Sequence, residues 1–307
     1  MKKISKLWLF LIITFTINFS MVGIFLSLGY EYKDTEGVIL GVLYMFVPML
    51  AALFVEKIVH KQKAAKSLFI SFKFNRWFLV AIAIPLVYTG LSIGISLLLP
   101  GVSFSMEMEG LFTRFEGLIT PEEMERMQLA LAASPIHPIL LTLIQGIIGG
   151  ITVNAVAAFG EELGWRGFLI KEYKDLHFAK ASLIIGVIWG IWHAPMILMG
   201  HNYPNNPQVG VLMMTVWCIL LSFPFSYIAI KAKSVIAAAL MHGMINGTAG
   251  LSIMLVVGGT DLTVGVTGLS GFIALVMVIL AIYIYDYKIS KEKIMGQTLA
   301  QTLNKHN

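Results

Sequence analysis

Residues 137–166 have the sequence HPILLTLIQGIIGGITVNAVAAFGEELGWR, an apolar run that ends in two glutamates and an arginine. An apolar stretch of about 20 residues is long enough to cross a bilayer as a helix. Ionisable side chains at membrane depth are costly, and they usually face the protein interior or a water-filled cavity. The stretch therefore predicts a membrane-spanning helix that carries Glu161, Glu162 and Arg166 toward the inside of a helix bundle.

The composition of the whole chain agrees with a membrane protein. Of its 307 residues, 57% are hydrophobic and only 13% are charged, whereas soluble domains have about 25% charged residues. The single cysteine, Cys218, excludes a disulfide scaffold and a zinc site made of cysteines. The chain has no Gly-rich phosphate loop and no basic–aromatic motif, so we expect no nucleic acid as a partner.

Further apolar runs extend this prediction in both directions, and they predict an all-α polytopic membrane protein of about eight transmembrane helices. The first run follows Lys-Lys like a signal peptide but is too long for one, so it is interpreted as an uncleaved span. The predicted spans are 7–28, 37–55, 77–99, 137–160, 181–199, 209–230, 234–257 and 266–286.

These spans define three segments. Residues 1–136 contain the first three helices and an outer loop, residues 137–257 contain the helices with the polar cluster, and residues 258–307 contain the last span and a tail. In the outer loop, Thr120-Pro121-Glu122-Glu123 predicts a helix start with a capping box. His201, in a second outer loop, is expected to be a solvated residue.

The loop charges predict the orientation. If the N-terminus is cytoplasmic, all but three of the 22 Lys and Arg residues lie on the inner side, the exceptions being Lys33, Arg114 and Arg126. This asymmetry follows the positive-inside rule. We therefore expect an integral cell-membrane protein with both termini in the cytoplasm and membrane lipid as a partner. The short Lys-Lys N-terminus and compact loops favour a bacterial source.

The polar residues within the last spans fall at one depth. At 1.5 Å per helical residue, Glu161 lies roughly 15 Å, His193 roughly 20 Å and His242 roughly 14 Å from the nearest inner lysine on its helix. These values predict a cavity in the cytoplasmic half of the membrane.

Residues four apart share a helix face, and three pairs around the cavity have this spacing. Glu162 can pair with Arg166 while the adjacent Glu161 faces the cavity. His242 and Asn246 can present two polar groups to it, and Trp189 shares a face with His193. Glycines flank each position and permit close helix contact.

These residues resemble the motifs of one membrane protease family. Glu161-Glu162-Leu163-Gly164-Trp165-Arg166 matches the EExxxR motif of the CAAX-protease and bacteriocin-processing (CPBP, or Abi) family. Trp189-Gly190-Ile191-Trp192-His193 resembles its FxxxH motif, and His242-Gly243-Met244-Ile245-Asn246 matches its HxxxN motif. Trp189 replaces the usual Phe, a change expected to affect packing only. The resemblance covers residues 137–250 and includes the type II CAAX prenyl endopeptidases.

The resemblance implies an intramembrane endopeptidase that cuts a membrane-associated peptide or protein. Glu161 would be the general base and His193 would help hold the water. His242 and Asn246 would stabilise the oxyanion, with Glu162, Arg166 and Trp189 in support. No cofactor is required in this scheme. Glu161, His193 and His242 could alternatively form a His₂Glu zinc site, although the chain has no HExxH motif.

Two other functions fit the same residues. One is a non-catalytic membrane scaffold or bacteriocin-immunity protein, in which the buried polar groups only join helices. The other is a proton-coupled transporter, but no inverted repeat supports it.

Overall fold

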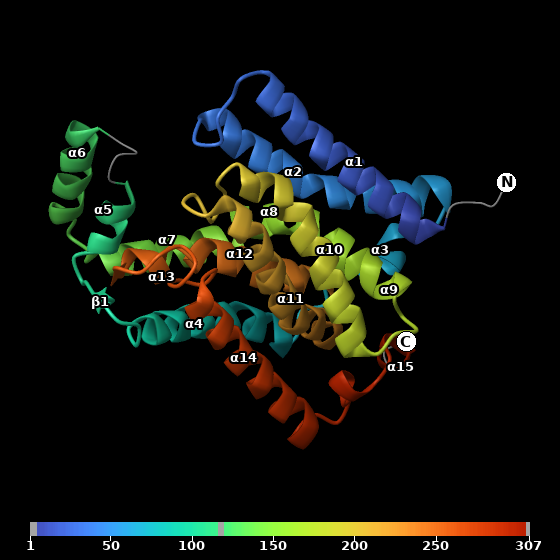
Figure 1. Ribbon diagram of the computed structural model, residues 1–307. Helices are drawn as coiled ribbons and strands as arrows, with labels where there is room; N and C mark the ends of the chain where they lie inside the picture. Colours follow the sequence, from blue (N-terminus) through green and yellow to red (C-terminus); the bar gives the residue numbers. More distant parts are fainter. Residues whose placement is uncertain (1–4, 116–119, 305–307) are drawn as a thin grey trace.

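A computed structural model of the chain describes residues 5–115 and 120–304, and most of this part is helical (Figure 1). Seven helices there are long and apolar enough to cross a membrane: α1 (Lys6–Ser27), α2 with its π-helical extension (together Thr35–Val59), α4 (Arg76–Ser96), α10 (Phe178–Leu198), α11 (Pro207–Ala232), α12 with α13 (together Val235–Met254) and α14 (Leu269–Lys288). An eighth span comes from α7 (Pro138–Ile151) and the helix over Val153–Glu172, which are bent by 44°. The predicted fold class is thus confirmed.

The remaining elements are short. They are α3 (Ala64–Ser67), β1 (Ser103–Phe104), α5 (Glu109–Phe115), α6 (Pro121–Ala132), β2 (Val256–Val257), a 3₁₀ turn (Ile294–Gly296) and α15 (Leu299–Asn304). Both hydrogen bonds of the predicted capping box are present at the start of α6. The predicted span 234–257 is too long, because its last two residues pair as β2 with β1.

The helices that carry the polar cluster lie in the middle of the molecule. Figure 1 shows α8 (Val153–Glu162), α10, α11 and α12 between the α1–α2 pair on one side and α4 with α14 on the other. α5 and α6 lie at one end of the bundle, and α3, α9 (Ile170–Glu172) and α15 lie at the opposite end. The cluster therefore has protein on both sides.

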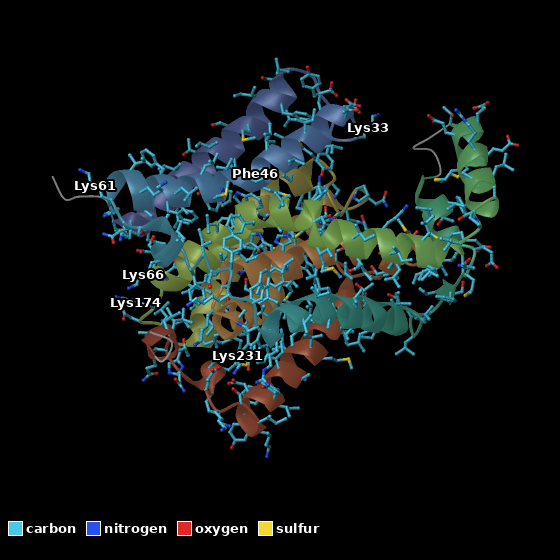
Figure 2. All side chains as sticks on the ribbon, turned by 180° about the vertical axis from the view of Figure 1, so that it is seen from behind. Lys33, Phe46, Lys61, Lys66, Lys174 and Lys231 are labelled. Carbon is cyan, nitrogen blue, oxygen red and sulfur yellow. The ribbon has the colours of Figure 1, made fainter. Side chains whose placement is uncertain are left out.

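Lysines gather at the end that holds α3 and α9. Lys61, Lys66 and Lys174 lie there, whereas Lys33 lies at the far end of the α1–α2 pair (Figure 2). The arrangement agrees with the charge asymmetry of the sequence, although Lys2, Lys3 and Lys305 lie outside the described residues. That this end faces the cytoplasm stays a prediction.

Glycines bring α12 against α7 and α8. A Cβ on Gly243 would collide with the Gly150 carbonyl oxygen and the Ala155 backbone, and one on Gly247 would collide with the Gly146 carbonyl oxygen. Small residues allow membrane helices to approach this closely. The predicted role of these glycines is confirmed, and the contact places His242 beside the end of α8.

The span that begins at residue 138 is not one straight helix. The backbone of Thr152 (φ −113°, ψ −97°) leaves the helical region between α7 and α8. The chain then continues as helix to Glu172, well past the predicted end at 160. The polar residues lie in the second half of this bent span, and the sequence pattern alone did not reveal the bend.

Candidate functional site

Glu161 lies in the last turn of α8 and is almost fully buried, with 2% of its surface exposed. Its Oε2 accepts a hydrogen bond of 2.7 Å from Nε1 of Trp189 on α10. A carboxylate has about four acceptor positions, so this bond orients the group without using up its capacity to accept a proton. The expectation that Trp189 affects packing only is wrong, because phenylalanine has no N–H to donate.

The Trp189 indole also brings the two predicted histidines together. Its ring centroid lies 5.6 Å from that of His193 and 5.5 Å from that of His242. Residues from α8, α10 and α12 thus meet around one aromatic side chain. The structure brings Glu161, His193 and His242 into one cluster, whereas their catalytic roles stay predictions.

Glu162 is the centre of a second, fully buried set of contacts. Its Oε1 lies 3.0 Å from Nη1 of Arg166 and accepts a hydrogen bond of 2.9 Å from Nδ1 of His242. Both members of the Glu162–Arg166 pair have no exposed surface, so the pair is deep in the protein and not at its edge. Two carboxylates that are adjacent in the sequence therefore have different surroundings, as their helical geometry predicts.

Arg166 is held on several sides. Its Nη2 donates to Ser222 Oγ at 2.8 Å, and its guanidinium lies 4.4 Å from the Trp189 ring centroid and 4.8 Å from that of Phe225. Ser222 and Phe225 come from α11, and sequence reasoning missed both. No spacing links them to the motifs, because they reach Arg166 from a separate helix.

The helix changes its winding where these side chains diverge. Residues Leu163–Leu169 form a π-helical segment directly after Glu162, and every residue in it is buried. Such segments are rare and are frequently found at functional sites. Gly164 lies against Pro48 of α2, and Gly167 lies against the backbone of Leu68. The wide turn therefore fits against α2 and against the residue that follows α3 only because these positions lack side chains.

The tautomer of His193 follows from its neighbour. Its Nδ1 lies 2.9 Å from the carbonyl oxygen of Trp189. Because a carbonyl can only accept, Nδ1 carries the proton and Nε2 of the neutral ring is an acceptor. Cys218 Sγ lies 3.7 Å from the same Nδ1, so this nitrogen is enclosed by protein. Nε2 is the nitrogen that can reach a water or a substrate.

Asn246 differs from the expectation of a buried cluster. It lies one turn after His242 on α12, yet its side chain is exposed. α12 packs tightly through its glycine face, and this packing leaves Asn246 at the surface of the bundle. An exposed amide is accessible to a substrate, and the oxyanion role of Asn246 stays a prediction.

The N-terminal helices support the site through a residue that carries no motif. Asn18 of α1 is fully buried, accepts a hydrogen bond of 2.8 Å from Trp192 Nε1 and donates one of 3.0 Å to the Tyr44 carbonyl. The Tyr44 hydroxyl donates to the Trp192 carbonyl at 2.7 Å. The Trp192 ring lies 4.7 Å from that of His193. A lone Asn within an apolar helix was the available signal for this contact.

The fit to a metal is poor. Within residues 5–115 and 120–304, no group of three His, Cys, Asp or Glu side chains is arranged to hold a metal ion. We therefore derive no reaction step through a metal.

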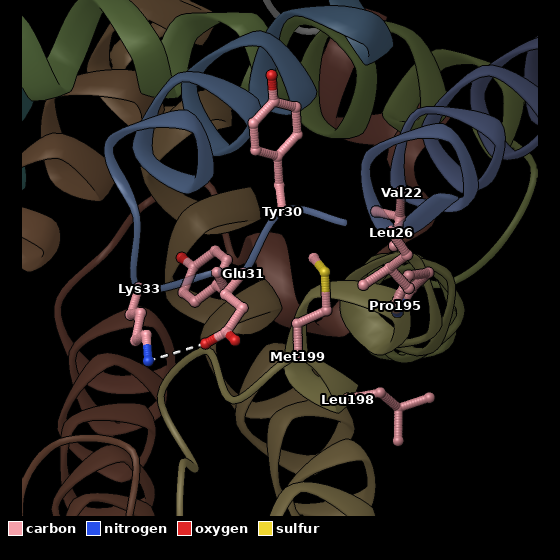
Figure 3. A pocket seen from close by; sticks show the side chains of 9 residues that line it. Val22, Leu26, Tyr30, Glu31, Lys33, Pro195, Leu198 and Met199 are labelled. Atoms are coloured by element: carbon pink, nitrogen blue, oxygen red, sulfur yellow. Dashed lines mark ion pairs between the residues drawn. The ribbon is translucent and has the colours of Figure 1, made fainter. Parts of the chain in front are cut away.

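A pocket of about 520 Å³ lies at the far end of α1 and α10 and contains none of the predicted site residues (Figure 3). Beside it, the Tyr32 hydroxyl lies 2.7 Å from Nδ1 of His201. Burial lowers the pKa of His201 to about 4, so the ring is neutral at pH 7. The expectation of a solvated His201 is wrong, because the ring ties two loops together.

The part of this chain that contains Glu161, His193 and His242 is similar in sequence to known proteins. Residues 137–248 match the model of the family described as type II CAAX prenyl endopeptidase Rce1-like. A curated relative, CAAX prenyl protease 2 of Methanococcus maripaludis, is 30% identical over 149 residues, which are 45% of this chain and 50% of the relative. The chain thus spans about half the length of the curated relative it matches. The resemblance drawn from the three motifs is confirmed over this region.

Proposed function

We propose that the chain is an intramembrane endopeptidase in which Glu161 activates the water that cuts a membrane-associated peptide or protein. The observation that carries this proposal is the setting of Glu161. Its carboxylate is buried and held by Trp189 Nε1, and the same indole contacts the rings of His193 and His242. The match of residues 137–248 to a family of membrane proteases supports the same reaction.

The reaction is a balanced hydrolysis. Glu161 takes a proton from water as the water oxygen adds to the substrate carbonyl carbon, and the carbonyl π electrons move to oxygen. The Glu161 carboxylic acid then gives that proton to the amide nitrogen as the C–N bond breaks. His193 Nε2 accepts a hydrogen bond from the same water and orients it.

His242 and Asn246 supply the oxyanion donors in this scheme. Glu162 accepts from His242 Nδ1, so His242 donates from Nε2 only as the imidazolium. The paired charges of Glu162 and Arg166 fix the Nδ1 side of this ring. Asn246, exposed one turn further along α12, meets the substrate from the open side.

The substrate can be identified by comparing the membrane peptides of cells that express the wild type and the Glu161→Ala variant. We expect at least one membrane-associated peptide or protein to accumulate uncut in the variant alone. A prenylated CAAX protein, a leader peptide and a bacteriocin precursor are separate outcomes of this comparison. Identical peptide sets from both strains would favour a non-catalytic scaffold.

We further propose that catalysis needs no metal. Purified protein treated with a strong zinc chelator should keep its full hydrolytic activity while elemental analysis finds no stoichiometric zinc. The physical reason is that, within the described residues, no third ligand is arranged with the two histidines to hold a metal ion. Loss of activity that zinc restores would instead support the His₂Glu site.

A further inference from the structure

A second cavity lies on the outside of the bundle, away from the polar cluster. It is a groove of about 470 Å³ between α4, α11 and α14, lined by Arg76, Trp77, Val80, Ala83, Ile84, Val87, Tyr227, Ile228, Val278, Ala281, Ile282 and Tyr285. None of the predicted catalytic residues lines it. Apart from its Arg76 end, the lining is apolar or aromatic.

The two ends of the groove differ in chemistry. Arg76 is the first residue of α4, and its side chain is exposed. No ion pair joins Arg76 to a carboxylate within the part of the chain that the structure describes. Val87, at the other end, is apolar and 57% exposed. The groove thus offers a free positive charge at one end and hydrocarbon contacts along the rest.

The aromatic mouth of the groove is fixed by contacts within the protein. The Trp77 ring lies edge-on to those of Tyr227 and Tyr285, with centroids 5.8 and 5.7 Å away. The buried Lys231 ammonium lies 5.0 Å from the Trp77 centroid (Figure 2 marks this lysine) and is itself paired with Glu292 at 2.5 Å. Because Lys231 is neutralised by Glu292, Arg76 is the unpaired cation that a ligand would meet.

Two carboxylates on the segment that follows the groove are bonded to groups of the protein. Glu292 is paired with Lys231. Asp286 is buried and accepts from the Tyr227 hydroxyl and from the backbone N–H groups of Ile294 and Met295. Neither acid lines the groove, so Arg76 is the charged residue of its lining.

The length of the groove matches one leaflet of a bilayer. From Arg76 to Val87 the helix advances eleven residues, or about 16 Å at 1.5 Å per residue. Half of a hydrocarbon core of about 30 Å is roughly 15 Å. Trp and Tyr also favour the interface between headgroups and acyl chains, so the three aromatic rings beside Arg76 suit the headgroup end of a lipid.

We propose that this groove binds one anionic glycerophospholipid, with its phosphate at Arg76 and one acyl chain along α4 and α14. Arg76 is the charge that recognises the phosphate, because Lys231 is already paired with Glu292, and the apolar floor holds the acyl chain. The bound lipid covers the seam between α4, α11 and α14. The groove contains none of the predicted catalytic residues, so lipid binding there does not depend on the protease proposal.

Native mass spectrometry of the purified full chain tests the site, with phosphatidylglycerol and phosphatidylcholine of identical chains as probes. The wild type should retain one phosphatidylglycerol in preference to phosphatidylcholine. Arg76→Gln should reduce that preference about fivefold, the effect of one basic residue near a lipid phosphate. Ala281→Trp fills the groove and should abolish retention of both lipids.

Leu280→Trp is the matched control, because Leu280 neighbours Ala281 on α14 and is 53% exposed but does not line the groove. It should retain lipid as the wild type does, and thermal unfolding should show that all variants are folded. Equal retention by Ala281→Trp and Leu280→Trp would overturn the site. Unchanged lipid preference in Arg76→Gln would overturn the role of the charge.

Discussion

Replacing Glu161 by glutamine should lower the rate of peptide hydrolysis by about 10²–10⁴-fold, the usual contribution of a general base. Glutamine has nearly the same shape as glutamate, and its side-chain oxygen can still accept the hydrogen bond from Trp189 Nε1. It cannot take a proton from water. The loss should therefore fall on kcat, measured with purified protein and a substrate peptide, with little change in KM.

The chain offers a matched control for this substitution. Glu172 lies on the same bent span, eleven residues after Glu161, and is only half-buried at the end of α9. Glu172→Gln makes the same chemical change outside the cluster and should leave kcat unchanged. A Glu161→Gln variant that is folded and has kcat close to the wild type would remove Glu161 from the mechanism.

Much of the fold follows from local features of the sequence. Apolar runs locate the spans because a helix must cross about 30 Å of hydrocarbon. The capping box at Thr120 and Glu123 depends on neighbouring residues only, and it forms as predicted. The Glu162–Arg166 pair also follows from helical spacing. Each of these features needs no knowledge of how the helices pack.

The parts that the sequence did not reveal depend on packing between helices. Ser222 bonds to Arg166 across 56 residues of sequence, and Asn18 bonds to Trp192 across 174. Such contacts depend on how each helix is rotated about its long axis. A span that is apolar on every side gives little sequence signal for this rotation.

Asn246 illustrates the limit of spacing arguments. The four-residue interval to His242 places both on one side of α12, but it does not say what covers that side. Gly243 and Gly247 draw α12 against α7 and α8, and the neighbours that bury His242 do not extend to Asn246. Whether Asn246 is buried therefore depends on how the helices of the bundle pack, whereas the face that it shares with His242 depends on α12 alone.

Replacing Arg166 by methionine should destabilise the protein by about 3–5 kcal/mol, the cost of leaving one member of a buried ion pair without its partner. Glu162 and Arg166 are both fully buried at 3.0 Å. Methionine has a length similar to the aliphatic part of arginine, so the main loss is the charge and its hydrogen bonds. Reversible unfolding in mixed micelles measures the change.

An exposed ion pair provides the control. Lys33 and Glu31 are 2.9 Å apart at the far end of the molecule, with 73% and 66% of their side chains exposed (Figure 3). Lys33→Met should not change the stability measurably, because water screens such pairs. Equal destabilisation by Lys33→Met and Arg166→Met would show that burial of the pair is not what matters.

The double variant Glu162→Leu, Arg166→Met separates stability from catalysis. Removing both charges leaves neither member of the pair without its partner, and such replacements are often neutral or stabilising, so most of the lost stability should return. Activity should not return, because His242 Nδ1 then lacks the Glu162 acceptor that fixes its ring. A stable double variant with full activity would show that the pair only joins helices. A stable, inactive one assigns the buried pair to holding His242 in place for the reaction.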